Sequence, residues 1–335
     1  MILKHKNAQV RINELPNGKR RISVRPFSKD LLIPTSTWET FYPVELIDLI
    51  LKIKGPAYLC DEIMRDEYPD YVKVGLESVI SDYTKKELFK SKNILDFGCG
   101  SGASTIVLAM VFPESRIAGV ELERDLLLIA EMRARFYNLK NINFVPSETT
   151  MHLPSGIGKF DLIVLNGVYE HLLEKERRLI IPEIWSVLNP GGVMFVNATP
   201  FRYCLIESHT SGLPFVNYLS DRLAHAVVSK FSRRFDKTIS WEYLLRAGIR
   251  GVTEQEIIST ILKEKNARPN VLKPLANGLN DRIDLWFASG GPQKRTILKR
   301  VFRVLAYFIL KVIKIVTGVT LLPYISIAVR KDDKY

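Results

Sequence analysis

Hydrophobic and polar positions follow two different periods along the middle of the chain. Short apolar runs bounded by turn residues alternate there with stretches in which apolar residues recur at helical spacing. Strands buried on both faces of a parallel sheet give such runs, and helices that cover the sheet give the amphipathic stretches. The pattern therefore predicts an α/β core over residues 89–200. Its predicted strands are 94–97, 116–121, 141–145, 159–166 and 193–197, and its predicted helices are 103–109, 124–139 and 183–188.

The residues before this core, 1–88, are expected to form a hairpin and a helical extension. Two β-type runs flank Pro16-Asn17-Gly18, which is a strong signal for a hairpin turn. Pro43 can begin a helix, an apolar stripe follows it, and residues 70–89 carry a second helical pattern. We interpret both parts as an elaboration that covers the core, with a flap over the substrate as the alternative.

Residues 201–281 are expected to form a helical lid over the acceptor. A helix is predicted over 215–235, and the capping box Thr253–Glu256 begins another that extends to about residue 263.

Residues 282–335 are expected to supply the last two strands, 282–288 and 324–329, with an amphipathic helix inserted over 294–318. Within this insert, Ile297–Val316 place basic residues on one stripe and apolar residues on the remaining face. The basic residues are Lys299, Arg300, Arg303, Lys311 and Lys314. Their frequency argues against a transmembrane span and fits an interfacial membrane anchor, in which they would add attraction to anionic lipid. Contact with a second copy and packing within the chain are the alternatives.

A glycine-rich turn follows the first strand of the core. Gly98, Gly100 and Gly102 occupy alternate positions, where glycine permits a tight turn and lets backbone N–H groups approach a ligand. The spacing also satisfies the loose dinucleotide pattern G-x-G-x-x-G/A. Asp96 separates the two interpretations, because a carboxylate at the strand end would repel a pyrophosphate but suits a ligand with an ammonium and a sulfonium.

The stretch Asp96–Gly102, D-x-G-x-G-x-G, resembles motif I of the class I S-adenosylmethionine (SAM)-dependent methyltransferases. Two later patterns are also typical of that family, F-D-L-I-V at 160–164 and L-x-P-G-G at 188–192. The resemblance covers about residues 93–200. It implies a Rossmann-like sheet of seven strands, the last pair antiparallel, with SAM as the cofactor.

The cofactor contacts follow from this resemblance and from the spacing. Asp96 and the glycine turn would hold the methionine end of SAM. Glu121 lies 19 residues beyond Gly102, at the end of the second strand, where a carboxylate can accept both ribose hydroxyls. Glu148 is the acid nearest to the position at which related enzymes bind the adenine amino group, although its spacing is one residue too long. Asn166, at the end of the fourth strand, completes the predicted cofactor set.

Three residues are candidates for removing a proton from an acceptor hydroxyl, in the order His209, His171, Glu170. The pair Glu170-His171 resembles the small-molecule branch that includes quinone-biosynthesis methyltransferases, and a structural pair that closes the cofactor pocket is the alternative. His209 lies in a polar loop beyond the fifth strand, at the sheet edge where α/β proteins hold ligands. T-P-x-R at 199–202 and H-T-x-x-L-P at 209–214 resemble methyltransferases found among glycan and cell-surface polymer genes.

Composition extends this picture in two respects. The 335 residues carry a formal charge of +12, which implies attraction to a membrane surface, a phosphorylated substrate or nucleic acid. The three cysteines stand at unrelated spacings, so we expect neither a disulfide framework nor a metal site, and a reducing, cytoplasmic setting is favoured. The N-terminus lacks an apolar segment of signal-peptide length.

These observations predict a SAM-dependent methyltransferase that O-methylates a sugar or a lipid-linked glycan, as a peripheral protein on the inner face of a membrane. A quinone or isoprenoid-lipid methyltransferase is the alternative within the same reaction class. An RNA methyltransferase is a second alternative, which the missing N-P-P-Y signature and the lack of a recognised RNA module disfavour. Association into a homo-oligomer is left open.

Overall fold

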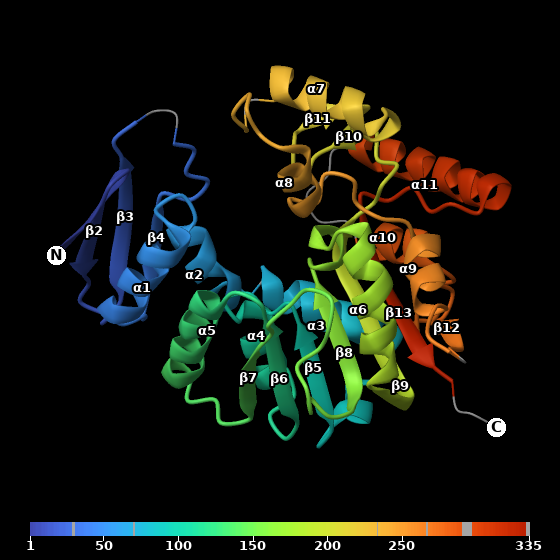
Figure 1. The fold of residues 1–335 in the computed structure, drawn as a ribbon, viewed down its shortest axis with the longest axis horizontal. Helices are drawn as coiled ribbons and strands as arrows, with labels where there is room; N and C mark the ends of the chain where they lie inside the picture. Colours follow the sequence, from blue (N-terminus) through green and yellow to red (C-terminus); the bar gives the residue numbers. More distant parts are fainter. Residues whose placement is uncertain (29–30, 70, 233, 266, 290–296, 333–335) are drawn as a thin grey trace. The chain divides into compact units, whose positions relative to one another are not determined.

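The computed structural model describes residues 1–28, 31–69, 71–232, 234–265, 267–289 and 297–332, and Figure 1 shows their arrangement along the chain. The chain divides into two compact units. Unit 1 consists of Met1–Ser78 and Lys90–Glu148, and unit 2 consists of Val79–Phe89 and Thr149–Tyr335. Each unit is described by itself.

Unit 1 begins with a four-stranded antiparallel sheet. Its strands are β1 (Ile2–His5), β2 (Ala8–Glu14), β3 (Arg20–Pro26) and β4 (Thr37–Thr40), which pair in that order. The predicted hairpin is confirmed, since β2 and β3 pair across a turn in which Gly18 has a φ of +78°. Alternate residues of β2 and β3 are buried, as in a sheet with one face against helices.

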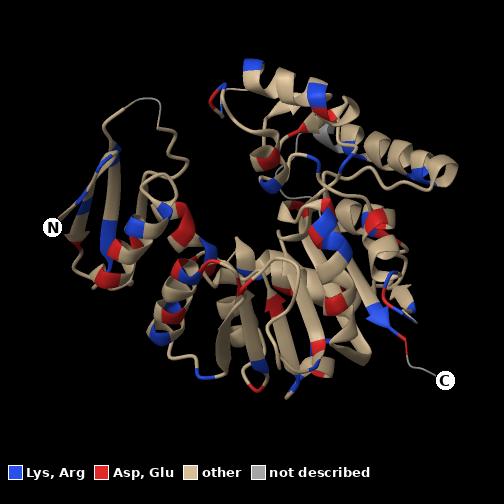
Figure 2. Cartoon of the chain, in the orientation of Figure 1, with Lys and Arg blue, Asp and Glu red and all other residues tan. Residues whose placement is uncertain are grey.

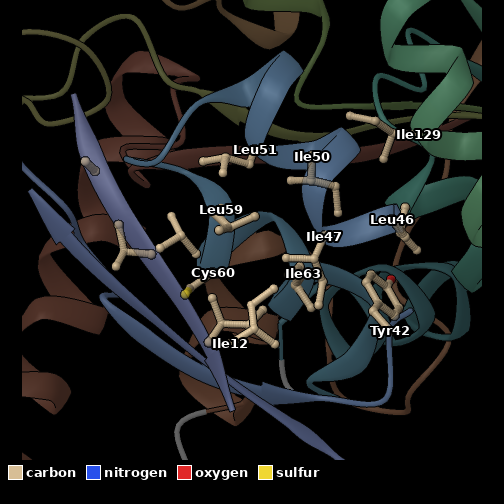
Figure 3. Close-up of a cluster of buried hydrophobic side chains, with 14 residues drawn as sticks. Ile12, Tyr42, Leu46, Ile47, Ile50, Leu51, Leu59, Cys60, Ile63 and Ile129 are labelled. Carbon is tan, nitrogen blue, oxygen red and sulfur yellow. The ribbon is translucent and has the colours of Figure 1, made fainter. Parts of the chain in front are cut away.

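Helices α1 (Val44–Lys54) and α2 (Leu59–Glu67) contribute to the core of this sheet. Figure 3 shows side chains of the strands and of both helices directed toward one another, together with Ile129 from a later helix. The sequence predicts α1 but not α2, because five of the nine residues of α2 are charged and read as a surface segment. Two of those charged residues, Glu62 and Asp66, are in fact buried.

The remainder of unit 1 alternates strands and helices. Its elements are β5 (Asn93–Phe97), α4 (Ala103–Val111), β6 (Arg116–Glu121), α5 (Arg124–Phe136) and β7 (Ile142–Pro146). β5, β6 and β7 pair in parallel, which confirms three of the predicted strands. Helix α3 (Val72–Tyr83) and the short 3₁₀ helix η1 (Lys86–Phe89) precede β5.

Unit 2 supplies the other strands of the main sheet. β8 (Phe160–Asn166) and β9 (Leu188–Pro200) pair in parallel, and between them along the chain lie η2 (Tyr169–His171) and α6 (Glu174–Ser186). β13 (Tyr324–Lys331) pairs antiparallel with β9, and β12 (Pro269–Val271) pairs antiparallel with β13. The seven strands have the order β12-β13-β9-β8-β5-β6-β7. This mixed sheet confirms the predicted Rossmann-like fold class with an antiparallel final pair.

One predicted strand is wrong. Residues 282–288 belong to helix α10 (Arg282–Ser289), and β12 forms the sheet edge instead. The segment contains residues that favour strands, such as Ile283, Trp286 and Phe287, but Asp281 accepts hydrogen bonds from the N–H groups of Ile283 (3.0 Å) and Asp284 (3.1 Å). A side chain that satisfies these first amides acts as a helix N-cap, and this capping outweighs the strand preference.

The residues between β9 and α10 are mainly helical. They form β10 (Ile206–Glu207), β11 (Leu213–Pro214), η3 (Val216–Tyr218), α7 (Asp221–Phe231), α8 (Trp241–Arg246) and α9 (Glu254–Ile261). The predicted cap of α9 is confirmed, since Thr253 accepts a hydrogen bond from the N–H of Glu256 at 3.1 Å. A small apolar cluster, which includes Val216, Val228 and Leu244, holds the first part of this segment together.

The long helix α11 (Ile297–Thr317) directs its polar face toward α10. Lys311 and Lys314 donate to the carboxylate of Asp281 at 3.0 and 2.7 Å, and Arg303 donates to the Phe287 carbonyl at 2.9 Å. The expectation that these three basic residues face lipid is therefore wrong, because they form contacts within the chain. The predicted positions of the Lys299 and Arg300 side chains lie outside the described residues.

The apolar face of α11 is exposed instead. Phe302 is 72% exposed, Phe308 is 61% exposed and Ile315 is 82% exposed. In Figure 2 most of α11 has the colour of uncharged residues. Across the described ranges, no helix combines the length and the hydropathy that a bilayer crossing requires.

Candidate functional site

The turn between β5 and α4 contains the three predicted glycines. Gly98, Gly100 and Gly102 have φ values of +72°, +54° and +88°, which residues with a β-carbon rarely adopt. A Cβ on Gly102 would lie 2.6 Å from the Cβ of Ala130 in α5. Gly102 is therefore required both by the turn and by the close approach of the two helices.

Asp96 lies at the end of β5 and is buried. Its Oδ2 accepts hydrogen bonds from the hydroxyls of Ser104 (2.7 Å) and Thr105 (2.6 Å), whereas its Oδ1 has no hydrogen-bond partner. Burial raises the pKa of Asp96 to about 6, although the two hydroxyls act in the opposite direction. A buried carboxylate oxygen without a partner, next to a glycine turn, fits a ligand that carries N–H donors and a positive charge.

Glu121, at the end of β6, is bonded to the same turn. Its Oε2 accepts a hydrogen bond from the N–H of Gly100 at 2.8 Å, and its Oε1 accepts from the N–H groups of Leu122 (2.7 Å) and Glu123 (3.1 Å). These bonds fix the direction of the carboxylate. Because a carboxylate offers about four lone-pair sites, Glu121 can still accept a hydrogen bond from a ribose hydroxyl.

A buried ionic cluster, which the sequence analysis missed, also holds the glycine turn. Arg133 in α5 is fully buried and donates to the carbonyl (2.8 Å) and hydroxyl (3.0 Å) of Ser101 and to Glu62 (3.1 Å). Burial opposes the ionisation of Glu62, but the cations around it, Arg133 first, outweigh burial and lower its pKa to about 2. One guanidinium thus connects α2 of the N-terminal segment to the turn.

The three predicted proton acceptors lie together in unit 2. Glu170 and His171 belong to η2, and His209 lies in the loop between β10 and β11. One ligand-type atom of each lies within 4.8 Å of those of the other two, and the two imidazole rings are 5.7 Å apart. Burial, and then the neighbouring His171, lower the pKa of His209, so its ring is neutral near pH 7.

Neighbouring segments orient this cluster. Nδ1 of His171 lies 2.6 Å from the carbonyl oxygen of Arg246, which can only accept, so Nδ1 carries the proton and Nε2 carries the lone pair in the neutral ring. The hydroxyl of Thr199 donates to Oε2 of Glu170 at 3.1 Å. Arg177 donates to the carbonyl oxygen of Glu170 at 3.2 Å and thereby fixes the backbone of η2.

Two side chains that the sequence analysis missed form hydrogen bonds with the backbone of the loop that carries His209. Glu207 is buried and accepts a hydrogen bond from the N–H of Thr210 at 2.8 Å. Arg234 donates to the carbonyl oxygens of Ser208 (3.0 Å) and His209 (3.4 Å). No local pattern pairs Arg234 with this loop, because 25 residues separate it from His209.

A cavity of about 390 Å³ lies next to this cluster in unit 2. Leu172 and Leu173, which follow His171, line it together with Leu245, which precedes Arg246. Its charged lining consists of the basic residues Arg177, Arg178, Arg202, Arg250 and Lys263 and the acidic residues Glu174, Asp221 and Glu256. The four arginines pair with these acids, Arg177 and Arg202 with Glu256, Arg178 with Glu174 and Arg250 with Asp221. The lining therefore keeps a modest positive excess, which favours a ligand with a negatively charged group over a cationic one.

The last two predicted cofactor residues make few informative contacts. Oδ1 of Asn166 accepts a hydrogen bond from the amide of Asn197 at 2.7 Å, which links the ends of β8 and β9. Glu148 is exposed. A cofactor contact of either residue stays a prediction.

Comparison with known proteins finds a family match that includes the glycine turn of unit 1. Residues 94–192 match the family model described as a methyltransferase domain, and His209 and α11 lie outside the match. "Uncharacterized protein RP028" of Rickettsia prowazekii is 30% identical over 108 residues, which are 32% of this chain and 43% of that protein. "Probable cobalt-precorrin-6B C(15)-methyltransferase (decarboxylating)" of Saccharolobus solfataricus is 24% identical over 149 residues, which are 44% of this chain and 71% of that protein.

A solved structure extends over more of the chain. PKMT2 from Rickettsia typhi aligns with 81% of this chain and 54% of its own, at 17% identity and a TM-score of 0.46. The matches cover 43%, 25% and 52% of the length of three curated relatives, so this chain corresponds to at most about half of each.

Proposed function

We propose that this chain, which contains a class I S-adenosylmethionine-dependent methyltransferase domain, transfers the methyl group of SAM to a hydroxyl of a sugar or a lipid-linked glycan at a membrane surface. SAM is the cofactor of that class of domain. In the reaction the acceptor oxygen bonds to the methyl carbon, and the sulfur–methyl bond breaks with its electron pair left on sulfur. The hydroxyl loses its proton. The observation that carries the proposal is the unpartnered Oδ1 of Asp96 beside the glycine turn.

Donor binding is assigned to unit 1. Asp96 would bind the ammonium of SAM through Oδ1, and Glu121 would accept hydrogen bonds from the ribose. Gly98, Gly100 and Gly102 would let the backbone approach the ligand. The methyl group of a sulfonium is already electrophilic, so the protein contributes mainly alignment and the exclusion of water.

Acceptor binding is assigned to unit 2. His209, His171 and Glu170 form a cluster that can take or polarise a hydroxyl proton. The adjacent cavity has more basic than acidic side chains, which supports an acceptor with a phosphate or another anionic group. A sugar attached to a lipid phosphate combines the hydroxyl and the negative charge. Residues 201–281 would act as the lid over this acceptor.

Exposed apolar side chains on α11 support the membrane surface as the place of reaction. A helix whose polar face is satisfied within the chain leaves its apolar face for an external apolar phase. The same feature would serve a quinone or isoprenoid-lipid acceptor, which is the second candidate. It argues against RNA, because Lys311 and Lys314 are paired with Asp281.

The double change Phe302→Ser/Phe308→Ser should release the protein from lipid vesicles. Each buried phenyl ring contributes about 1.5–3 kcal/mol, so the loss of two should lower partitioning by roughly 100-fold or more. We expect little dependence on anionic lipid or on salt, because Arg303, Lys311 and Lys314 bond within the chain. Flotation with neutral and with anionic vesicles measures both effects.

The matched control for the flotation experiment is Phe231→Ser, since Phe231 in α7 is 60% exposed and Phe308 is 61% exposed. Equal flotation of the control and the double variant would show that α11 is not the membrane contact. Stronger retention on RNA than on vesicles, measured at two salt concentrations, would favour the nucleic-acid alternative.

The affinity for SAM should rise as the pH increases through about 6. Asp96 has a raised pKa of about 6, so its carboxylate is largely protonated near pH 5 and ionised near pH 7. Only the ionised form attracts the cationic ligand, and the affinity should increase about tenfold over this window. Isothermal titration of SAM at several pH values measures this increase.

The effect of Asp96 on folding stability has the opposite sign. Its stabilising contribution is present below the unfolded pKa near 4 and is lost as the pH rises through 6, because burial raises the pKa in the folded state.

Asp96→Asn is the control for the titration, and its affinity should be weak and independent of pH in this window. Glu121→Ala should weaken SAM binding by roughly 10- to 100-fold, since hydrogen bonds to a charged group contribute about 1.5–3 kcal/mol. Absence of SAM binding in the unaltered protein, or binding that neither variant weakens, contradicts the proposed function.

A further inference from the structure

Glu170 presents a buried oxygen for which the described residues provide no hydrogen-bond partner. Its side chain is fully buried, and Oε2 accepts the hydroxyl of Thr199, but Oε1 has no hydrogen-bond partner. Nε2 of His171 lies 3.8 Å from Oε1, which is too long for a hydrogen bond. An unpaired carboxylate oxygen in a buried position is costly, and a cation is the partner that best removes this cost.

In the neutral ring of His171 the proton is on Nδ1, so the nitrogen nearer to Glu170, Nε2, has no proton to donate. Nδ1 donates to the Arg246 carbonyl at 2.6 Å, so in the neutral ring Nε2 directs a lone pair toward the Glu170 carboxylate. Histidine ligands of metal ions in proteins show this arrangement, in which the second nitrogen donates to a backbone carbonyl and fixes the ring. Two facing lone pairs repel each other unless a positive charge lies between them.

The third ligand is a ring nitrogen of His209, and the backbone leaves space for it. Gly248 has a φ of +86°, and a Cβ there would lie 3.0 Å from Cγ of Glu170 and 3.1 Å from Nε2 of His209. The preceding carbonyl, that of Ala247, accepts the hydroxyl of Thr210 at 2.7 Å and so anchors the loop of His209. The segment after α8 therefore shapes the cluster from one side.

We propose that Glu170, His171 and His209 bind a divalent transition-metal ion, which in turn binds the acceptor through its reacting hydroxyl and a neighbouring oxygen. The inference rests on the proposed function for the identity of the acceptor, but the ion site itself does not. It departs from the sequence-based expectation that the chain has no metal site. Two imidazoles and one carboxylate form the ligand set that Zn²⁺, Fe²⁺ and Co²⁺ favour, whereas Mg²⁺ and Ca²⁺ favour all-oxygen sites.

The geometry requires a modest closure on binding. Ligand atoms of a tetrahedral site lie about 3.4 Å from one another, because each is about 2.0–2.1 Å from the metal. The three atoms here lie within 4.8 Å of one another, so the most distant pair must approach by up to about 1.4 Å. His171 is 44% exposed, and His209 lies in a loop, which leaves both rings room to turn.

Three protein ligands would leave one position open in a four-coordinate site and two when the ion becomes five-coordinate, as catalytic zinc ions can. An ion held by these three side chains would lower the pKa of an acceptor hydroxyl that it contacts and so favour loss of the hydroxyl proton to water before methyl transfer. A vicinal diol of a sugar offers two oxygens at the right separation for chelation. The acceptor class would then be a hydroxyl with an adjacent oxygen rather than an isolated alcohol.

The test uses the full chain, treated with a chelator and dialysed, and titrates it with Co²⁺ and with Zn²⁺. We expect one ion per chain by calorimetry and visible absorption bands for Co²⁺. Loss of an outer partner of a metal ligand costs roughly 10- to 100-fold in affinity, so Glu170→Gln and His209→Ala should each cost at least as much. SAM titration of the same samples reports whether each variant is folded in unit 1.

The matched control is His152→Ala. His152 is 65% exposed and lies 3.3 Å from Glu183, and it is not a member of the Glu170–His171–His209 cluster. Binding of Co²⁺ should be unchanged in this variant. Absence of Co²⁺ and Zn²⁺ binding, or binding that Glu170→Gln and His209→Ala leave unchanged, overturns the site.

A second measurement tests whether the bound ion is needed for methyl transfer, independently of whether the ion binds. Transfer of tritium from methyl-labelled SAM into a lipid and glycan extract of a strain that lacks this protein should stop after chelation and return with added metal. Transfer that chelation leaves intact overturns the role of the ion. If Co²⁺ binds as expected while SAM does not bind, the proposed function fails and the ion site stands.

Discussion

Replacement of Arg133 by methionine should lower the free energy of unfolding by about 3–5 kcal/mol, because it leaves the buried carboxylate of Glu62 without its main cation. The guanidinium is fully buried, and it also carries the hydrogen bonds to Ser101. Methionine has a similar length, so the loss would arise mainly from charge and hydrogen bonding. Urea denaturation followed by circular dichroism measures the change.

The control lies two residues along the same helix. Arg135 is 73% exposed, donates to the carbonyl oxygen of Glu131 at 3.4 Å and lies 3.9 Å from the Glu131 carboxylate, so Arg135→Met should change stability by no more than about 0.5 kcal/mol. Because Ser101 belongs to the glycine turn, Arg133→Met should also weaken SAM binding under conditions in which the protein remains folded. Equal stability of the two variants would show that the buried cluster does not stabilise the fold.

The change His209→Ala should reduce methyl transfer by about 10²- to 10⁴-fold and leave the affinity for SAM unchanged. The imidazole lies with Glu170 and His171 in unit 2, whereas the residues assigned to SAM lie mainly in unit 1. Either role of His209, as a base or as a metal ligand, predicts this separation of turnover from donor affinity. Tritium transfer into the extract and calorimetry with SAM measure the two quantities.

His152→Ala again serves as the histidine control for the transfer measurement, since its side chain is exposed and lies outside the cluster of Glu170, His171 and His209. Transfer by His209→Ala at the rate of the unaltered protein would remove His209 from the reaction. A parallel fall in SAM affinity would instead point to a change in the fold rather than to a role at the acceptor.

Local signals account for the parts of the fold and site that the sequence predicted well. The glycines of the turn, Asp96 at the strand end and the Thr253 cap are read from neighbours in the sequence, and the structure has the expected backbone at each. The strands of the core also follow, because wholly apolar runs between turn residues have few alternatives. The candidates Glu170, His171 and His209 were identified one by one, from strand ends and loops.

Long-range contacts account for what the sequence could not supply. Arg133 stands in a charged helix and reads as exposed, yet partners 71 residues away bury it. The segment 282–288 contains residues that favour strands, whereas the cap from Asp281 and the contacts with α11 stabilise it as a helix. Nothing in the sequence brings His209 to Glu170, because their approach depends on Glu207, Arg234 and Gly248.

The outward apolar face of α11 has a practical consequence for work with the purified protein. In detergent-free buffer, the exposed phenylalanines and isoleucines meet other copies before they meet lipid, so concentrated samples should cluster and precipitate. A mild detergent or nanodiscs during extraction would keep the preparation monodisperse. Such additives are therefore part of the sample conditions under which binding and turnover are best measured.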